Sequence, residues 1–439
     1  MKTQHSELSA EVMMNATSQD QHDIERERLL RVLSAATFVI FFQAFMVAPI
    51  IPLLATAFRV SPQDAGLIVP AYLVPYGAAT LIYGLLADRY GLWRIMAGSL
   101  LAFATLTALT ATARSVEGLA IWRMVTGLGA AGVVPLALTL VGKLFPYELR
   151  GRPLGWLFGA MAGGMAFGST FGALLEPYVG WRGLFLAAGL AGLSVFLVLL
   201  PRRRLLGGVV PAAGGGLGAL LRGYGSLLGT PRGARTYTFV LVNSMFHSGV
   251  FTWLGLYFEQ RYGLGPVGIG LALVGYGVPG FLFGPAIGRI ADRYGRGRLL
   301  PIGLALGAIG AAALILDVPL LVAVMAVTVL SLGYDTTQPL FAGIVTALGG
   351  PRPGQAMGLN VFTLFLGFGL GSLVFGEVLH IGFGTTLTLF AMIEIALAFV
   401  AVWLFAAERP STGSQELCGR LGDDGELKAA YRGGCRSLP

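Results

Sequence analysis

Four ionisable side chains lie inside long apolar stretches of this sequence, where a charge is costly and therefore marks a candidate functional site. They are Asp335 in "SLGYDTTQPLF", Arg123 in "RMVTGLGAAG", Glu394 in "AMIEIALAF" and His247 in "NSMFHSG". A carboxylate or imidazole in such a place can bind a proton from one side and release it to the other as water access alternates. We predict that these residues couple the protein to a proton gradient. Asp335 is the best acidic candidate, because it lies deep in a long apolar stretch among polar neighbours, and Gln338 shares its helix face at i+3.

Each of the four residues also has a structural interpretation. Asp335 can be a hydrogen-bonding post between helices, and His247 a satisfied polar contact. Arg123 stands early in its apolar stretch, so that its head group can reach the surface. Glu394 can face lipid in its protonated form. The sequence leaves these alternatives open.

The composition indicates which elements position these side chains. Only 12% of the residues are charged, and the mean hydropathy is +0.74, whereas soluble domains carry about 25% charged residues. A helix needs about 20 apolar residues to cross a bilayer. The expected fold class is an all-α membrane protein with twelve transmembrane helices. They are predicted at residues 32–56, 67–87, 95–113, 118–142, 154–175, 182–200, 236–258, 267–287, 299–316, 319–346, 356–379 and 384–407.

The basic residues predict an orientation, because they concentrate on the cytoplasmic side of membrane proteins. With both termini in the cytoplasm, the outer loops hold only Arg59, Arg114, Arg182 and Arg261. No cleaved signal peptide is expected, and the first span would direct insertion into the cell (inner) membrane. The predicted organisation is a cytoplasmic tail at 1–31, a six-helix bundle at 32–200, a cytoplasmic linker at 201–235, a second six-helix bundle at 236–407 and a cytoplasmic tail at 408–439.

Two charged phrases repeat at matching places in the two predicted bundles. "GLLADRYGLWR" at 84–94 follows the second span, and "GRIADRYGRGR" at 288–298 follows the eighth. Such an internal repeat indicates two pseudo-symmetric bundles that rock about a midplane site. We expect the glycines to let helices approach and the charges to latch the cytoplasmic side, although basic residues there can also be plain topology signals. The predicted gate comprises Gly84, Asp88, Arg89, Arg94, Gly288, Asp292, Arg293, Arg296 and Arg298, with Glu148 and Arg150 of "FPYELRGRPLGW" as partners.

These phrases resemble the loop signature of the major facilitator superfamily, Gly-x-x-x-Asp-Arg/Lys-x-Gly-Arg/Lys-x-Arg/Lys. The second copy fits it fully, whereas Leu92 replaces a basic residue in the first. The resemblance covers all twelve spans and is greatest to the drug–proton antiporter type. It also implies that Arg123 belongs to the family pattern Arg-x-x-x-Gly-x-Gly, with Gly127 and Gly129 in register.

A further family pattern, found in the fifth span of many antiporters, is only partly present. Gly164, Gly168 and Gly172 keep its four-residue spacing, but Ser169 replaces a proline and Ala173 a glycine. We expect these glycines to form a seam for close helix packing.

Large apolar side chains and a few polar anchors on the first, seventh and tenth spans indicate a cavity for amphipathic organic molecules. Gln43 stands where some drug-efflux members carry an acidic residue, which puts their proton site in doubt here. The predicted cavity residues are Gln43, Phe42, Phe45, Met46, Asn243, Phe246, Trp253 and Gln338.

The expected function is proton-coupled secondary transport of small amphipathic organic molecules by alternating access, in the direction of efflux. The alternatives are uptake of an organic acid or sugar and, in another class, a non-transporting membrane sensor. No catalytic constellation, metal-ligand spacing or nucleotide-binding loop is visible, so neither an enzyme nor a metal site is expected. The expected partners are the substrate, protons and the lipid bilayer, with no cofactor, no nucleic acid and a monomeric state.

Overall fold

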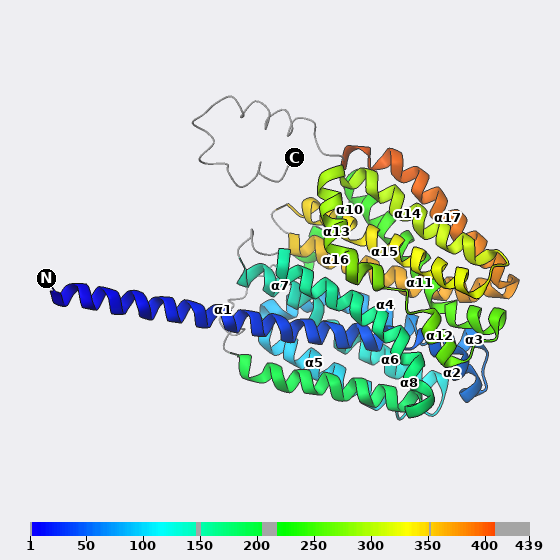
Figure 1. The fold of residues 1–439 in the computed structure, drawn as a ribbon, viewed down its shortest axis with the longest axis horizontal. Coiled ribbons are helices and arrows are strands. Elements are labelled where there is room, and N and C mark those ends of the chain that lie inside the picture. Colours follow the sequence, from blue (N-terminus) through cyan, green and yellow to red (C-terminus); the bar gives the residue numbers. More distant parts are fainter. Residues whose placement is uncertain (1, 146–150, 204–216, 351–352, 409–439) are drawn as a thin grey trace.

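The computed structural model describes residues 2–145, 151–203, 217–350 and 353–408, and all regular elements in these ranges are helical (Figure 1). The N-terminal half, residues 2–203, contains α1 Lys2–Phe45, η1 Ala48–Ile50, α2 Ile51–Phe58, α3 Pro62–Gly66, α4 Pro70–Tyr90, α5 Leu92–Thr110, α6 Val116–Ala130, α7 Val133–Leu144, α8 Gly151–Leu199 and η3 Leu200–Arg202. The C-terminal half, residues 217–408, contains α10 Leu217–Leu228, α11 Pro231–Tyr262, α12 Pro266–Ala272, α13 Val278–Tyr294, α14 Arg296–Ile315, α15 Leu320–Leu348, α16 Pro353–Val378, η4 Leu379–Ile381, α17 Phe383–Leu404 and η5 Ala406–Glu408.

Ten segments of the described chain are long and apolar enough to cross a membrane. One of them, Gly155–Arg202, joins two predicted spans: the backbone of Gly180 has a φ of 68° and is not helical. A positive φ costs glycine little, because it has no Cβ. The predicted span at 267–287 is divided between α12 and α13, neither of which reaches the length of a span alone.

Three other predicted spans are interrupted rather than continuous. The first breaks after Phe45, close to Pro49 and Pro52, which lack the N–H that a helix interior requires. The second, predicted at 67–87, begins with an irregular stretch at 67–69, which separates α4 from the short helix α3 before it. The fourth divides at Ala131 and Gly132. The backbone N–H of Gly132 donates to the Ser99 hydroxyl at 3.0 Å. Broken helices persist in membranes only where other groups satisfy their backbone.

Glycine seams hold helices together within each half. A Cβ added to Gly164, Gly168 or Gly172 of α8 would lie 2.5–2.6 Å from a backbone oxygen of α1 or of Met46, which follows it. In the C-terminal half, Gly367 and Gly371 of α16 likewise face backbone oxygens of α11, those of Leu241 and Met245. Backbones approach this closely only where side chains are absent.

The two halves meet along a few helices. In Figure 1 the N-terminal half occupies the lower part of the molecule and the C-terminal half the upper part, and α4 contacts α16 while α8 contacts α12 and α13. Near the ends of α1 and α11 the contact is tight, since a Cβ on Gly255 would lie 2.9 Å from the Pro49 carbonyl. The centre of the molecule therefore lies between two helical bodies that meet through α4 and α16, through α8 with α12 and α13, and near the ends of α1 and α11.

Candidate functional site

Aromatic rings from both halves meet at this centre. Phe45 of α1 lies 5.6 Å from Phe251 of α11 and 6.1 Å from Phe368 of α16, measured between ring centroids. Tyr76 of α4 lies 4.3 Å from Phe365 of α16. Such rings offer flat apolar surfaces to an organic molecule. Phe45 was predicted from the sequence, whereas the rings on α4 and α16 were not, because only the tertiary fold brings them to the same place.

Buried polar groups accompany these rings. The amide of Gln43 and both ring nitrogens of His247 have no hydrogen-bond partner within the described part of the protein. Asn243 donates to the Thr337 hydroxyl at 3.0 Å, but its carbonyl oxygen is unpaired. An unsatisfied buried polar group costs about 1–3 kcal/mol, so such a set marks a candidate ligand site. Other unpaired atoms of the same kind are Tyr72 Oη, Tyr76 Oη, Gln338 Nε2 and Asn360 Oδ1.

The predicted cavity residues divide into two groups. Phe45 lies at the centre, and Gln43, two residues before it on α1, is buried with its amide unpaired. Phe42, Met46 and Trp253 instead pack helices together. The backbones of Phe42 and Met46 touch the α8 glycine seam, and the Trp253 ring fills the space between Gly66 and Gly376. The indole N–H of Trp253 donates to the Ser372 carbonyl at 3.0 Å, and Phe246 packs on the His247 ring.

Arg123 is fully buried on α6, and its guanidinium binds carbonyl groups at two helix breaks. Nε donates to Ile68 O at 3.0 Å, Nη1 to Gln43 O at 3.3 Å and Nη2 to Ala44 O at 3.3 Å. The guanidinium also lies 4.6 Å from the centre of the Tyr72 ring. The last carbonyls of a helix lack partners within it and favour a cation. The side chain does not extend to the surface, and it stabilises the broken ends of α1 and the α3–α4 connection.

Asp335 on α15 caps a third helix break. Its Oδ2 accepts hydrogen bonds from the Gly280 N–H at 2.8 Å and the Ser331 hydroxyl at 2.9 Å. The same hydroxyl accepts the Gly277 N–H at 2.7 Å. Gly280 is the third residue of α13, where backbone N–H groups have no partner inside the helix. Gly277, the residue before α13, has a φ of 86° and no side chain that could accept a hydrogen bond from these N–H groups. The carboxylate therefore supplies the cap from a neighbouring helix.

Ser331 was missed by sequence reasoning. The available signal was the phrase "GYGVPG" at 275–280, whose glycines and proline predict a helix break that needs an external cap.

The four candidate coupling residues do not form one cluster. Within the described residues no hydrogen bond or ion pair joins Arg123 to Asp335, which belong to different halves. His247 lies beside Tyr334, with 5.2 Å between ring centroids, and so adjoins the Asp335 region. Glu394 on α17 is fully buried, and neither carboxylate oxygen has a partner in the described chain.

Residues 33–348 and 261–417 match the family described as Major Facilitator Superfamily. The chain belongs to the major facilitator superfamily. It is a multi-pass membrane protein, and the relatives that it matches are transporters or resistance proteins, not enzymes.

The alignments with curated relatives extend over only part of this chain. A niacin transporter of Acinetobacter baylyi is 31% identical over 35% of the chain and 35% of its own length. A chloramphenicol resistance protein of Streptomyces lividans is 29% identical over 60% of the chain and 67% of its own length. A 4-hydroxybenzoate transporter of Acinetobacter baylyi is 29% identical over 45% of the chain and 43% of its own length. The chain thus spans about a third of the first relative and two thirds of the second.

Solved structures share the fold across nearly the whole chain. The human organic anion transporter MFSD10 has a TM-score of 0.67 at 18% identity, covering 86% of this chain and 99% of that one. A bacterial homologue of the human lysosomal transporter Spinster, solved inward-facing and unoccupied, has a TM-score of 0.65 at 18% identity, covering 88% and 99%. At this identity the likeness concerns the fold alone.

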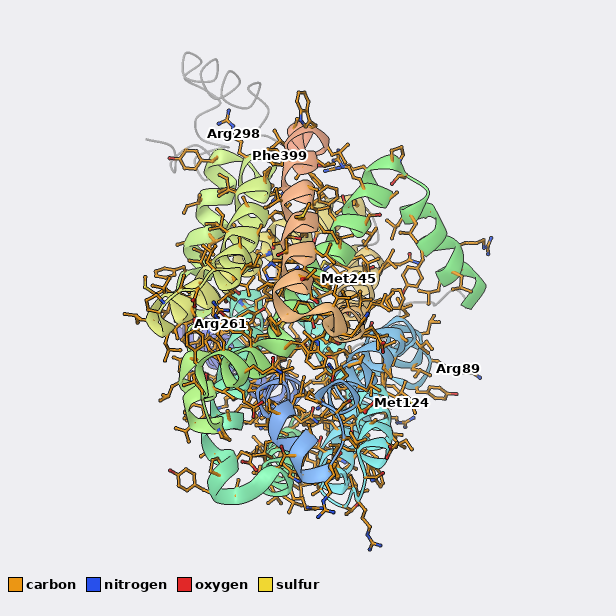
Figure 2. All side chains as sticks on the ribbon, turned by 90° about the vertical axis from the view of Figure 1, so that its right-hand side faces the viewer. Arg89, Met124, Met245, Arg261, Arg298 and Phe399 are labelled. Atoms are coloured by element: carbon orange, nitrogen blue, oxygen red, sulfur yellow. The ribbon has the colours of Figure 1, made fainter. Side chains whose placement is uncertain are left out.

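The superfamily loop signature is only partly visible. Arg89 and Arg298 project outward (Figure 2), Arg94 is also exposed, and Arg296 lies against Gly343 of α15. Among the described residues a Cβ on Gly84 would meet nothing within 4 Å, so no close helix approach is seen at this glycine and its role in the gate stays a prediction. Glu148 and Arg150 lie outside the described residues, as do the side-chain surroundings of Asp88, Gly288, Asp292 and Arg293.

The glycines of the fourth span lie at helix contacts. Gly127 abuts the backbone of Tyr72, and a Cβ on Gly129 would lie 3.1 Å from that of Ala102. They bring α6 close to α4 and α5, which places Arg123 against the helix breaks that it binds.

Proposed function

We propose that this superfamily member is a proton-coupled secondary transporter that exports small amphipathic organic molecules across the inner membrane by alternating access. The observation that carries this proposal is the group of buried, unpaired polar side chains among aromatic rings from both halves. Gln43 on the N-terminal half and Asn243 and His247 on the C-terminal half would bind the polar part of a substrate, and the rings its apolar part.

The proposed architecture has twelve spans in two six-helix bundles, at 32–200 and 236–407, with both termini cytoplasmic. Ten apolar segments, the non-helical Gly180 within α8 and the divided α12–α13 segment support this count. The linker between the bundles would lie at the cytoplasmic surface, where α10 contacts the start of α16 through a hydrogen bond from Gln355 to the Leu220 carbonyl.

We further propose that Asp335 carries the coupled proton. Protonation would remove the negative charge that favours the N-terminus of α13 and would weaken the bond from Gly280. The start of α13 also touches the other half, because a Cβ on Gly277 would lie 2.8 Å from that of Ala166. A change at this cap therefore acts directly on the contact between α13 and α8, where the halves must move past each other.

A second candidate is uptake of an aromatic acid. It is favoured by the names of two relatives, a niacin transporter and a 4-hydroxybenzoate transporter. Against it, the donors of Arg123 that would meet a carboxylate are already bonded to three backbone carbonyls.

Transport by purified protein in liposomes with an imposed pH gradient separates these functions. For export coupled to protons, amphipathic compounds move against the direction of proton flow. An aromatic acid that moves together with protons would instead establish the uptake function. If nothing in a varied panel moves faster than in protein-free liposomes, transport itself is refuted.

A further inference from the structure

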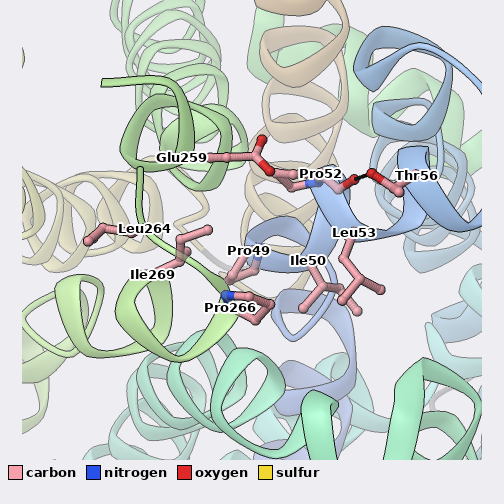
Figure 3. Close-up of a pocket in the computed structure, with 9 residues that line it drawn as sticks. All are labelled: Pro49, Ile50, Pro52, Leu53, Thr56, Glu259, Leu264, Pro266 and Ile269. Atoms are coloured by element: carbon pink, nitrogen blue, oxygen red, sulfur yellow. Dashed lines mark hydrogen bonds between the residues drawn. The ribbon is translucent and has the colours of Figure 1, made fainter. Parts of the chain in front are cut away.

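A cavity of about 240 Å³ lies at the predicted outer end of the molecule, away from the central site. Figure 3 shows its walls: Pro49 to Thr56 come from the N-terminal half, and Glu259 to Ile269 come from the C-terminal half. Glu259 stands one helical turn beyond Gly255, which touches the Pro49 backbone. The cavity is therefore directly outside the point where the two halves close on each other.

The walls of this outer cavity offer almost no hydrogen-bond donor. Pro49, Pro52 and Pro266 have no backbone N–H. The Thr56 hydroxyl donates to the Pro52 carbonyl at 3.1 Å. The N–H groups of Ile50, Leu264 and Ile269 are bonded to backbone carbonyls. A bound anion would find nothing to pair with, whereas an apolar group would find isoleucine, leucine and proline side chains.

The one charged group at this cavity is Glu259. Its side chain is exposed and extends toward Pro52 on the opposite wall (Figure 3), and its carboxylate has no hydrogen bond or ion pair within the described chain. The nearby Arg261 does not neutralise it, because Arg261 pairs with Asp317 at 2.9 Å. An ionised carboxylate only accepts hydrogen bonds, so the cavity combines apolar walls with an uncompensated negative charge.

We propose that the outer cavity is a binding site for an amphipathic organic cation, such as an aryl or alkyl ammonium ion. The apolar part lies on the proline-rich wall, and the cationic head faces Glu259. Because the two walls belong to different halves, a bound cation stabilises the arrangement in which the halves touch at this end. The site is separate from the central one, and binding to it requires no transport.

Protection of an introduced thiol tests this site directly. The full chain carries Cys418→Ser and Cys435→Ser, which remove both native cysteines, and Thr56→Cys at the cavity wall. Benzyltrimethylammonium should slow reaction of this thiol with a neutral maleimide by about threefold, as a weak, partly exposed charge pair allows. Phenylacetate, of similar size but opposite charge, should not slow it.

Two further variants test whether the protection depends on the Glu259 carboxylate itself or on negative surface charge in general. Glu259→Gln should abolish the protection by benzyltrimethylammonium. Glu377→Gln, which also removes an exposed carboxylate near the predicted outer end, should leave it intact. Equal protection by cation and anion, protection by neither, or protection that persists in Glu259→Gln would overturn the proposal. Leu53→Cys provides a second reporter on the same wall if Thr56→Cys does not fold.

Discussion

The carboxylate of Asp335 on α15 accepts a hydrogen bond from the backbone N–H of Gly280, the third residue of α13, at 2.8 Å. An acidic side chain deep in a membrane protein thus has a definite structural partner, the unpaired start of a broken helix. Arg123 has the complementary role in the other half, where it binds carbonyls at helix ends. The buried Arg123 and the partly buried Asp335 are therefore held by groups of neighbouring helices rather than by each other.

Arg123→Lys should lower the free energy of unfolding by about 2 kcal/mol, because one ammonium group cannot reach all three carbonyls and leaves at least one unsatisfied. Thermal unfolding in detergent measures this loss. Arg182→Lys is the matched control, since Arg182 makes one bond to the Ala113 carbonyl at 3.1 Å and is exposed. Equal stability of the two variants would show that the buried bonds of Arg123 contribute nothing.

Gly168→Ala should destabilise the protein by about 1–3 kcal/mol, because the added Cβ overlaps the backbone of α1. It would lie 2.5 Å from the Phe42 carbonyl oxygen. Gly159→Ala on the same helix is the control, since its Cβ would meet nothing within 4 Å. The glycine seam would lose its explanation if both substitutions changed the unfolding temperature equally.

Glu408 should make stability dependent on pH in the acidic range. Partial burial raises its pKa, but hydrogen bonds from Arg232 and Arg235, both at 2.7 Å, outweigh burial and hold the pKa below its ordinary value. A lowered folded-state pKa contributes stability above the unfolded-state pKa, about 4.3, and loses it as the pH falls through the folded value. Glu408→Gln should therefore lower the unfolding temperature at pH 7, and the difference from the native chain should shrink below about pH 4.

A matched variant makes that pH experiment specific. Glu377→Gln, at an exposed carboxylate without an arginine partner in the described chain, should leave the unfolding temperature unchanged at both pH values. A stability difference for Glu408→Gln that is constant from pH 7 to the acidic range would contradict an ionic role.

The sequence predicted the helical spans because each contains enough apolar residues to be recognised locally. It also predicted a close-packing seam from the spacing of Gly164, Gly168 and Gly172. It did not predict which groups stabilise the breaks in the spans, since these groups are distant in the chain. Arg123 binds a carbonyl 80 residues away, and Asp335 an N–H 55 residues away. No local periodicity encodes such pairs.

The sequence likewise predicted some residues of the candidate site and missed those that depend on contacts between the two halves. Gln43 was expected to contribute its side chain, and the structure adds that its carbonyl holds Arg123. Tyr76 and Phe365 were missed because an aromatic residue in a span has the same local pattern whether it faces lipid or a neighbouring bundle. Only the contact between α4 and α16 distinguishes the two.

Asp335 caps α13 and, we propose, carries the coupled proton, and the Asp335→Asn variant separates these two roles. The asparagine oxygen can still accept the Gly280 N–H, so the variant should fold and insert normally, but it cannot exchange a proton at this position. Asp335→Ala loses the cap as well and should be less stable, which identifies the structural contribution.

The decisive measurement compares two activities of Asp335→Asn in liposomes at equal protein insertion. Transport driven by a pH gradient should be lost, while exchange of labelled for unlabelled substrate without a gradient should persist, because exchange needs movement of the halves but no net proton transfer. Full gradient-driven transport by Asp335→Asn would contradict the account and leave Glu394 or His247 as the residue that carries the proton.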